Sequence, residues 1–277
     1  MRRRVLLLVT VPFLVLSFAA PAKATDRGQP PLAHRPLYLA LGDSVAFGVG
    51  ASDRGTTAYV PLLYDRLREE LPCQGSGQPG CRKLALQNLA VGGATTASLI
   101  TTQLPVAVEE LRTRNQDHRP NNDVKVVTID IGGNDVFSVV PSCTAGPTPA
   151  CLGLVQASLQ AFETNFTKIL GELRAAGGPD TQIVAMTYYN PLPSCQLAAL
   201  AGLAEVVLEG GPGIEGLNDR IRRISAAYGV EVADAYGKLA AADLVGGTDC
   251  LHPNDSGHGI IADLFAAALA RAEAQAA

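Results

Sequence analysis

Short apolar runs, rich in valine, isoleucine and leucine, alternate along this chain with longer stretches whose apolar residues recur every three or four positions. The short runs predict buried strands, and the periodic stretches predict helices with one apolar face. The predicted strands span residues 37–41, 84–88, 124–131, 182–187 and 230–234. The predicted helices span residues 58–70, a stretch that ends near 111, residues 155–173, residues 214–228 and about 257–275.

The strongest helix signal lies in the middle of the chain. Six apolar residues there are spaced by three or four: Val155, Leu159, Phe162, Phe166, Ile169 and Leu173. Strands that alternate with such helices indicate the α/β class, a parallel sheet covered on both faces. No internal repeat or linker divides the chain, so we expect one domain. Ligands of such sheets bind at the carboxyl ends of the strands, so we expect the functional residues to follow the strands.

The first residues predict a secretory signal peptide and not part of the fold. Three arginines, at positions 2–4, precede an apolar run that ends at Ala20, and Ala22-Lys23-Ala24 offers a cleavage site. The run is shorter than the roughly 20 residues of a membrane span, although an uncleaved anchor is the alternative. We therefore expect residues 1–24 to be removed, and residues 25–277 to form a single secreted domain without a stable membrane anchor.

The charge of the mature chain bears on its partners. The whole chain has 22 Lys and Arg against 26 Asp and Glu, and the leader holds four of the basic residues and no acid. The mature part therefore carries 18 basic and 26 acidic residues, a net charge of −8. A charge of that sign repels polyphosphates, so no nucleic-acid partner is expected.

All six cysteines lie in the predicted mature part, as expected of disulfides in an exported protein. None forms a Cys-x-x-Cys, so zinc and redox sites are not indicated, and we expect no metal. Six cysteines allow 15 connectivities. Their spacing favours sequential pairing: Cys73–Cys81, Cys143–Cys151 and Cys195–Cys250.

The stretch LALGDSVAFGVG, residues 39–50, places polar and glycine residues directly after the first predicted strand. Two interpretations compete: a glycine loop that cradles phosphate, and a turn that presents Ser44 as a nucleophile. The phosphate interpretation fails because the glycine pattern that starts at Gly48 needs a third glycine where Asp53 stands. A serine nucleophile, in turn, needs an imidazole base and a group that fixes its tautomer.

Only four histidines are present, and His252 is the best candidate base because it follows Asp249 by three residues. His258 is the alternative, at the start of the last predicted helix, whereas His34 and His118 are expected to be solvated. Acyl transfer also needs hydrogen-bond donors for a developing oxyanion. Gly93 and Asn134, after the second and third strands, are the candidates, although glycine and asparagine at such places often only make turns.

With these residues the sequence resembles the SGNH hydrolases, also called GDSL lipases and esterases. It contains four of their catalytic blocks in order: GDSVAFG around Ser44, NLAVGGATT around Gly93, GGND around Asn134, and DCLHP around Asp249 and His252. One departure is a valine after the serine, where the family name has leucine. Another serine-esterase fold, the α/β-hydrolases, is not indicated because the chain has no Gly-x-Ser-x-Gly.

The resemblance implies a three-layer α/β/α, flavodoxin-like fold with no cofactor. It implies Ser44 as nucleophile, His252 as base and Asp249 as the group that orients it. It also implies an oxyanion hole made by the Ser44 and Gly93 amides and the Asn134 side chain. The cysteine pairs look like those of secreted bacterial lipases in this family.

The resulting expectation is a monomeric, secreted ester hydrolase that acts on small-molecule or lipid esters. Lipid or aryl acyl esters are favoured over acetylated polysaccharide, because the chain has no tryptophan to stack on sugars and residues 135–141 are largely apolar. Those apolar residues could equally be core. The alternative from another functional class is a catalytically silent binding protein of the same fold.

Overall fold

The computed structural model describes residues 35–70, 84–143, 146–195 and 198–276 of the 277-residue chain. The predicted signal peptide, His34 and the Cys73–Cys81 pair lie outside the described residues. The two other predicted disulfides are present: Cys143 is bonded to Cys151, and Cys195 to Cys250. No helix in the described ranges is both long and apolar enough to cross a membrane.

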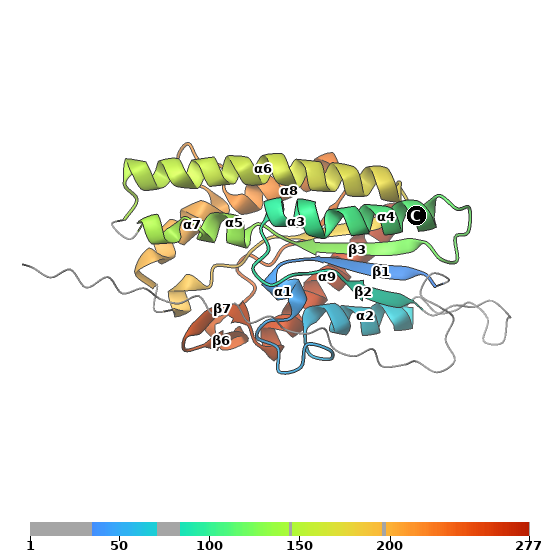
Figure 1. The fold of residues 1–277 in the computed structure, drawn as a ribbon. Coiled ribbons are helices and arrows are strands. Elements are labelled where there is room, and N and C mark those ends of the chain that lie inside the picture. Colours follow the sequence, from blue (N-terminus) through green and yellow to red (C-terminus); the bar gives the residue numbers. More distant parts are fainter. Residues whose placement is uncertain (1–34, 71–83, 144–145, 196–197, 277) are drawn as a thin grey trace, which may run out of the picture.

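A parallel sheet of five strands forms the centre of the described part (Figure 1). In chain order the strands are β1 (Leu37–Gly42), β2 (Ala85–Asn88), β3 (Val124–Asp130), β4 (Gln182–Met186) and β5 (Glu231–Ala233). Their order across the sheet is β2-β1-β3-β4-β5, with every neighbouring pair parallel. This is the flavodoxin-like order, so the predicted α/β/α fold class is confirmed.

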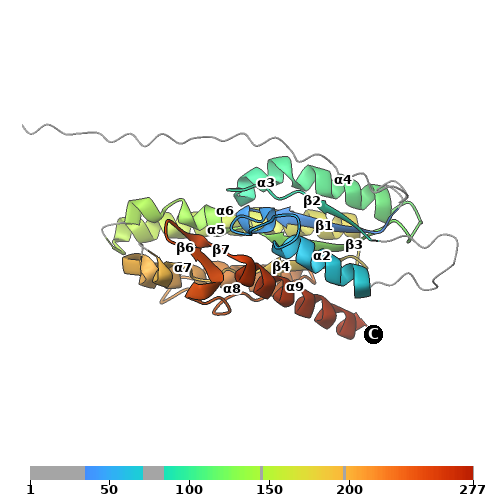
Figure 2. The ribbon, with the colours of Figure 1, turned by 90° about the horizontal axis from the view of Figure 1, so that it is seen from below.

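Helices cover both faces of the sheet (Figure 1). One face carries α2 (Tyr59–Glu70) and α9 (Asp255–Ala276), which pack side by side (Figure 2). The other face carries α3 (Thr96–Thr102), α4 (Leu104–Asn115), α6 (Pro149–Gly177) and α8 (Leu217–Ala227). Thr148 caps the start of α6 by accepting a hydrogen bond from the Cys151 amide, and Gly178 follows its end. The six apolar residues that predicted α6 are all buried.

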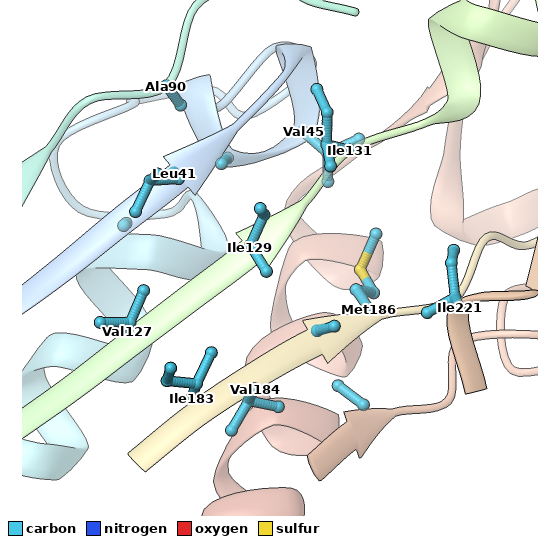
Figure 3. Close-up of a cluster of buried hydrophobic side chains, with 14 of the residues drawn as sticks. Leu41, Val45, Ala90, Val127, Ile129, Ile131, Ile183, Val184, Met186 and Ile221 are labelled. Atoms are coloured by element: carbon cyan, nitrogen blue, oxygen red, sulfur yellow. The ribbon is translucent and has the colours of Figure 1, made fainter. Parts of the chain in front are cut away.

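The core lies between the sheet and these helices, because side chains of a parallel strand are buried on both faces. Figure 3 draws the part of this core between β1, β3, β4 and the helices beside them. Its labelled side chains are Leu41, Val45, Ala90, Val127, Ile129, Ile131, Ile183, Val184, Met186 and Ile221. All belong to one cluster of buried apolar residues, which gives the strand ends a rigid base.

Several short elements differ from the prediction. The helix predicted to end near residue 111 is two helices, α3 and α4, which meet at Gln103 just before Pro105. Three short helices were not predicted: α1 (Ser44–Phe47), α5 (Gly133–Phe137) and α7 (Ala201–Glu209). The antiparallel pair β6 (Leu244–Gly246) and β7 (Asp249–Pro253) was not predicted either. Four segments of the described residues form short 3₁₀ helices: Val140–Cys143, Leu192–Ser194, Ala198–Leu200 and Ala241–Asp243.

Candidate active site

The predicted nucleophile, Ser44, lies on a tight turn between β1 and α1. Asp43 caps α1, because its Oδ1 accepts a hydrogen bond from the Val45 amide at 3.0 Å. Gly48 ends α1 in the left-handed conformation, with a φ of 87° that glycine adopts without strain. The turn leaves the Ser44 side chain half-buried at the carboxyl end of the sheet.

The predicted base and its orienting carboxylate lie together on β7. Nδ1 of His252 is 2.8 and 2.9 Å from the two carboxylate oxygens of Asp249, and Nε2 is 2.9 Å from Oγ of Ser44. Because a carboxylate only accepts, the ring proton belongs on Nδ1, which leaves Nε2 free to accept from the Ser44 hydroxyl. The structure therefore brings the three residues into one hydrogen-bonded chain.

The nucleophile loop contains a second glycine, Gly50, because this position lies close to the backbone of β7. Its φ is 91°, and a side chain there would collide with the Pro253 carbonyl oxygen and lie 3.2 Å from Cβ of His252. The glycine therefore lets the loop after Ser44 approach the backbone that carries His252. The glycine pattern that could have suggested phosphate binding serves the contact between nucleophile and base.

Two further contacts hold β7 in place. The Tyr189 hydroxyl donates to the Leu251 carbonyl at 2.7 Å. The Cys195–Cys250 disulfide joins β7 to the segment that follows β4. Cys250 stands between Asp249 and His252 in sequence, so this bond restrains the strand that carries both.

His258, the alternative base, has other partners. Its Nδ1 accepts a hydrogen bond from the Tyr59 amide at 3.3 Å, and its Nε2 donates to the Val49 carbonyl at 3.0 Å. Burial lowers the pKa of His258 below its usual value, which favours the neutral ring that these two bonds require. His258 therefore links α9 to the loop after Ser44. His118 lies in the loop after α4.

The two candidate oxyanion donors lie on adjoining loops. Asn134, in α5, donates from Nδ2 to the carbonyl of Ala94 at 2.9 Å, and Ala94 directly follows Gly93. The next residue, Asp135, accepts from the Thr96 amide at 2.9 Å and from its hydroxyl at 2.5 Å. These bonds tie the loop after β2 to the loop after β3. An amide group has two hydrogens, so Asn134 keeps one for another acceptor.

Comparison with known proteins shows the family of the chain and its shared fold. The model of the GDSL-like lipase/acylhydrolase family matches residues 40–260, which is most of the chain. The chain belongs to this family. The resemblance noted in the sequence is thereby confirmed at the level of the family.

This chain covers nearly the whole length of several similar proteins whose structures have been solved. The lipase Lip_vut3 from a goat rumen metagenome is 21% identical, with a TM-score of 0.62 over 84% of this chain and 97% of that one. An extracellular lipase from Streptomyces rimosus is 21% identical, with a TM-score of 0.57 over 84% and 99%. Phospholipase A1 from Streptomyces albidoflavus NA297 is 19% identical, with a TM-score of 0.54 over 84% and 99%. At these identities the likeness shows the shared fold.

In this member of the GDSL-like family, a pocket opens beside Ser44 and His252. Its lining combines aromatic and aliphatic side chains with the polar groups of Ser44, Asn134 and His252. It is lined by Asp43, Ser44, Val45, Gly133, Asn134, Phe137, Tyr188, Tyr189, Pro191, Leu251 and His252. Gly93 lies outside this lining, on the adjoining exposed loop. Among the described residues no cluster of three or more His, Cys, Asp or Glu is placed to hold a metal ion.

Sequence reasoning missed several residues of the site. Tyr188 and Tyr189 come two and three residues after the end of β4, and Asp130 is the last residue of β3. Their position was the available signal, because polar or aromatic residues at the ends of parallel strands face the ligand side of the sheet. Phe137, by contrast, falls in the apolar stretch 135–141 that the sequence offers as a pocket wall, and it lines the pocket.

Proposed function

We propose that this chain is a secreted serine hydrolase that cleaves carboxylic esters through an acyl-enzyme on Ser44. One observation carries the proposal: Ser44, His252 and Asp249 form a continuous hydrogen-bonded chain, and Ser44 and His252 line a pocket. This is the arrangement that lets an imidazole take the proton of a serine hydroxyl and lets a carboxylate stabilise the imidazolium that results.

The proposed reaction has two halves. In the first, His252 accepts the Ser44 proton as Oγ attacks the ester carbonyl, and then donates it to the departing alcohol. In the second, His252 takes a proton from a water molecule that attacks the acyl carbonyl, and it returns this proton to Oγ of Ser44 as the acid leaves. Asp249 holds the ring in the required tautomer throughout.

The oxyanion that forms in each half needs donors already in position. The candidates are the Ser44 amide, the Gly93 amide and the second hydrogen of Asn134 Nδ2. The Ser44 amide lies at the first position of α1, where a helix leaves its amides without an internal partner. Loss of one such donor typically lowers kcat about 10²–10³-fold.

The walls of the pocket favour an acyl group of several carbons. Phe137 lines both the pocket beside Ser44 and a second, smaller pocket beneath α7. The second pocket is lined only by apolar side chains: Phe137, Leu192, Leu200, Leu203, Ala204, Val207 and Leu208. An apolar chain that passed Phe137 would be removed from water, which stabilises binding by about 0.8 kcal/mol for each buried CH₂. Lipid or aryl acyl esters are therefore the proposed substrates.

Export is part of the proposal. Two disulfides are present, as in proteins that fold in oxidising compartments, and one structural relative is described as an extracellular lipase. We infer that residues 1–24 are a signal peptide and that residues 25–277 act as a single domain. Sequencing the amino terminus of the exported protein tests the cleavage site.

The activity is tested with the purified mature protein on p-nitrophenyl esters of increasing acyl length, with phospholipid and acetylated xylan alongside. We expect hydrolysis of medium or long acyl esters, covalent labelling of Ser44 by a fluorophosphonate, and loss of both in Ser44→Ala. No labelling would favour a silent binding protein. Activity confined to acetylated xylan would overturn the proposed substrate class.

A pair of variants tests the second pocket separately. Ala204→Phe places a ring in the pocket from the buried face of α7, so it should lower kcat/KM for long acyl esters much more than for acetate. Gly202→Phe is the matched control, because Gly202 on the same helix is exposed and a side chain there meets open space. Equal losses on short and long esters in Ala204→Phe would contradict the acyl-pocket assignment.

A further inference from the structure

Two aspartates are buried against each other beneath the Ser44 turn. Asp43 is 2% exposed and Asp130 is fully buried. The register of β1 and β3 places Gly42 beside Asp130, so Asp43 follows immediately, and its amide donates to the Asp130 carbonyl at 3.1 Å. Their carboxyl groups accept hydrogen bonds from two consecutive amides of α1, so the two groups lie side by side. Neither residue has a role in the acyl-transfer steps proposed above.

The remaining bonds of the pair reach the nucleophile helix and two phenols. Asp43 Oδ1 accepts from the Val45 amide at 3.0 Å, and Asp130 Oδ2 accepts from the Ala46 amide at 3.1 Å. The Tyr188 hydroxyl donates to Asp43 Oδ2 at 2.6 Å, and the Tyr59 hydroxyl donates to Asp130 Oδ1 at 2.5 Å. The two amides that follow Ser44 are thus each fixed by one member of the pair.

Among the described residues, every donor that binds the pair is a neutral amide or phenol, so no cation balances its charge. Two negative charges side by side within a dry interior would repel strongly, so only one group can ionise. Burial and the neighbouring Asp43 charge raise the pKa of Asp130 well above its usual value. Burial also raises the pKa of Asp43, but the hydrogen bonds it accepts from Tyr188 and Val45 oppose that rise.

The surrounding titratable groups are consistent with one proton and one charge. Those that face the pair are Tyr38 of β1, Tyr59 of α2, Tyr188 and Tyr189 after β4, and His252 of β7. Burial raises the pKa of the four phenols, which stay protonated and able to donate. None of these groups is a lysine or arginine that could neutralise a second carboxylate.

We propose that Asp43 and Asp130 share a single proton, held on Asp130, and that this carboxyl–carboxylate pair positions the Ser44 turn for its contact with His252. The positioning role in this proposal rests on the proposed function. The shared proton is independent of that function. Loss of the proton would place two charges behind Val45 and Ala46 and push the loops after β1 and β3 apart.

The pH dependence of unfolding tests the proton without any assay of activity. An aspartate of the unfolded chain loses its proton near pH 3.9, whereas the folded pair keeps one. The folded state therefore binds one more proton above about pH 5, so the unfolding equilibrium constant rises tenfold per pH unit until the pair itself ionises. Asp130→Asn keeps a neutral donor to Asp43 and lacks this proton.

We expect the ratio of the wild-type unfolding constant to that of Asp130→Asn to rise tenfold per pH unit in denaturant titrations. Asp263→Asn makes the same change at an exposed carboxylate on α9 and should keep the wild-type pH dependence. Parallel pH curves for wild type and Asp130→Asn would overturn the shared proton. Infrared spectra of wild type labelled with ¹³C at aspartate carboxyls give a second test, needing no variant: absence of a protonated-carboxyl band at pH 7 overturns it too.

Kinetics test the positioning role. Asp130→Ala should lower kcat more than 10²-fold with little change in KM, since a misplacement of about 1 Å can cost that much. Asp130→Asn, which can still bond Asp43 and the Ala46 amide, should recover kcat to within tenfold of wild type. A kcat for Asp130→Ala equal to that of Asp130→Asn would overturn the positioning role. If wild type hydrolyses no ester, the proposed function fails while the unfolding and infrared measurements still decide the proton.

Discussion

Removing the Cys195–Cys250 disulfide should damage activity beyond its effect on stability. The bond attaches β7, which carries Asp249 and His252, to the 3₁₀ turn Leu192–Ser194, whose neighbours line both pockets. The change is Cys195→Ala with Cys250→Ala. Alanine is chosen for both because Cys250 is buried and a serine hydroxyl there would need a partner.

The size of the effect follows from the loop that the bond closes. Cys195 and Cys250 are 55 residues apart, and chain entropy gives about 4 kcal/mol for a loop of that length. Without the bond, β7 is held near the pocket mainly by hydrogen bonds such as that from Tyr189 to Leu251, each worth about 1 kcal/mol. A shift of His252 by about 1 Å would then lower kcat on the order of 10²-fold.

The second disulfide supplies the matched control. Cys143 and Cys151 are eight residues apart, so the same entropy model gives about 2.5 kcal/mol for their loop. Both double variants are followed by thermal unfolding and by ester hydrolysis well below each variant's own melting temperature. We expect both to melt earlier, and only the Cys195/Cys250 variant to lose kcat while still folded.

Two results would refute this reasoning. If the Cys195/Cys250 variant kept the wild-type kcat below its melting temperature, the bond would stabilise the fold without restraining His252. If peptide mapping of the purified protein paired Cys250 with a different cysteine, the premise itself would fail. A loss of kcat in both double variants would point to a general loosening of the pocket instead.

Three further predictions concern single residues. Gly50→Ala should lower kcat on the order of 10²-fold, because its Cβ would collide with Pro253 and displace His252; activity near wild type would contradict the close approach. Asn134→Ala should lower kcat about 10²–10³-fold with a smaller effect on KM, and a change in KM alone would remove Asn134 from the oxyanion role. His258 is buried and neutral with a lowered pKa, so wild type should lose stability as pH falls below about 6.5. His258→Gln should flatten that acid limb in urea titrations between pH 7 and pH 5, and an unchanged limb would contradict the assignment.

The elements that sequence reasoning predicted well are those with a strong local signal. The strands β1 and β3 are buried on both faces and therefore form continuous apolar runs. The helix α6 is long enough, at 29 residues, for its apolar stripe to repeat many times. The candidate site residues Ser44 and Asn134 each lie three residues after a predicted strand, so the fold class alone brings them to one edge.

The elements it missed are set by contacts between distant segments. The break between α3 and α4 places the Gln103 side chain against the nucleophile turn, where it bonds both the amide and the carbonyl of Gly42. The sequence around residue 103 contains no signal for a hydrogen bond to Gly42, which lies 61 positions away. The strands β6 and β7 are too short for any periodicity, and β7 depends on a tyrosine and a cysteine from the segment after β4.

Asp130 differs from these misses because the sequence did contain its signal. A strand buried on both faces normally reads as an unbroken apolar run, and an aspartate at the end of such a run needs a reason. A carboxyl group that cannot reach water must lose its charge or find a partner, and β1 ends beside it at Gly42, with Asp43 as the next residue. The two polar residues that interrupt neighbouring apolar runs are therefore most simply understood together. An acid that ends a buried parallel strand, next to a candidate nucleophile, predicts a paired and partly protonated carboxyl from the amino-acid pattern alone.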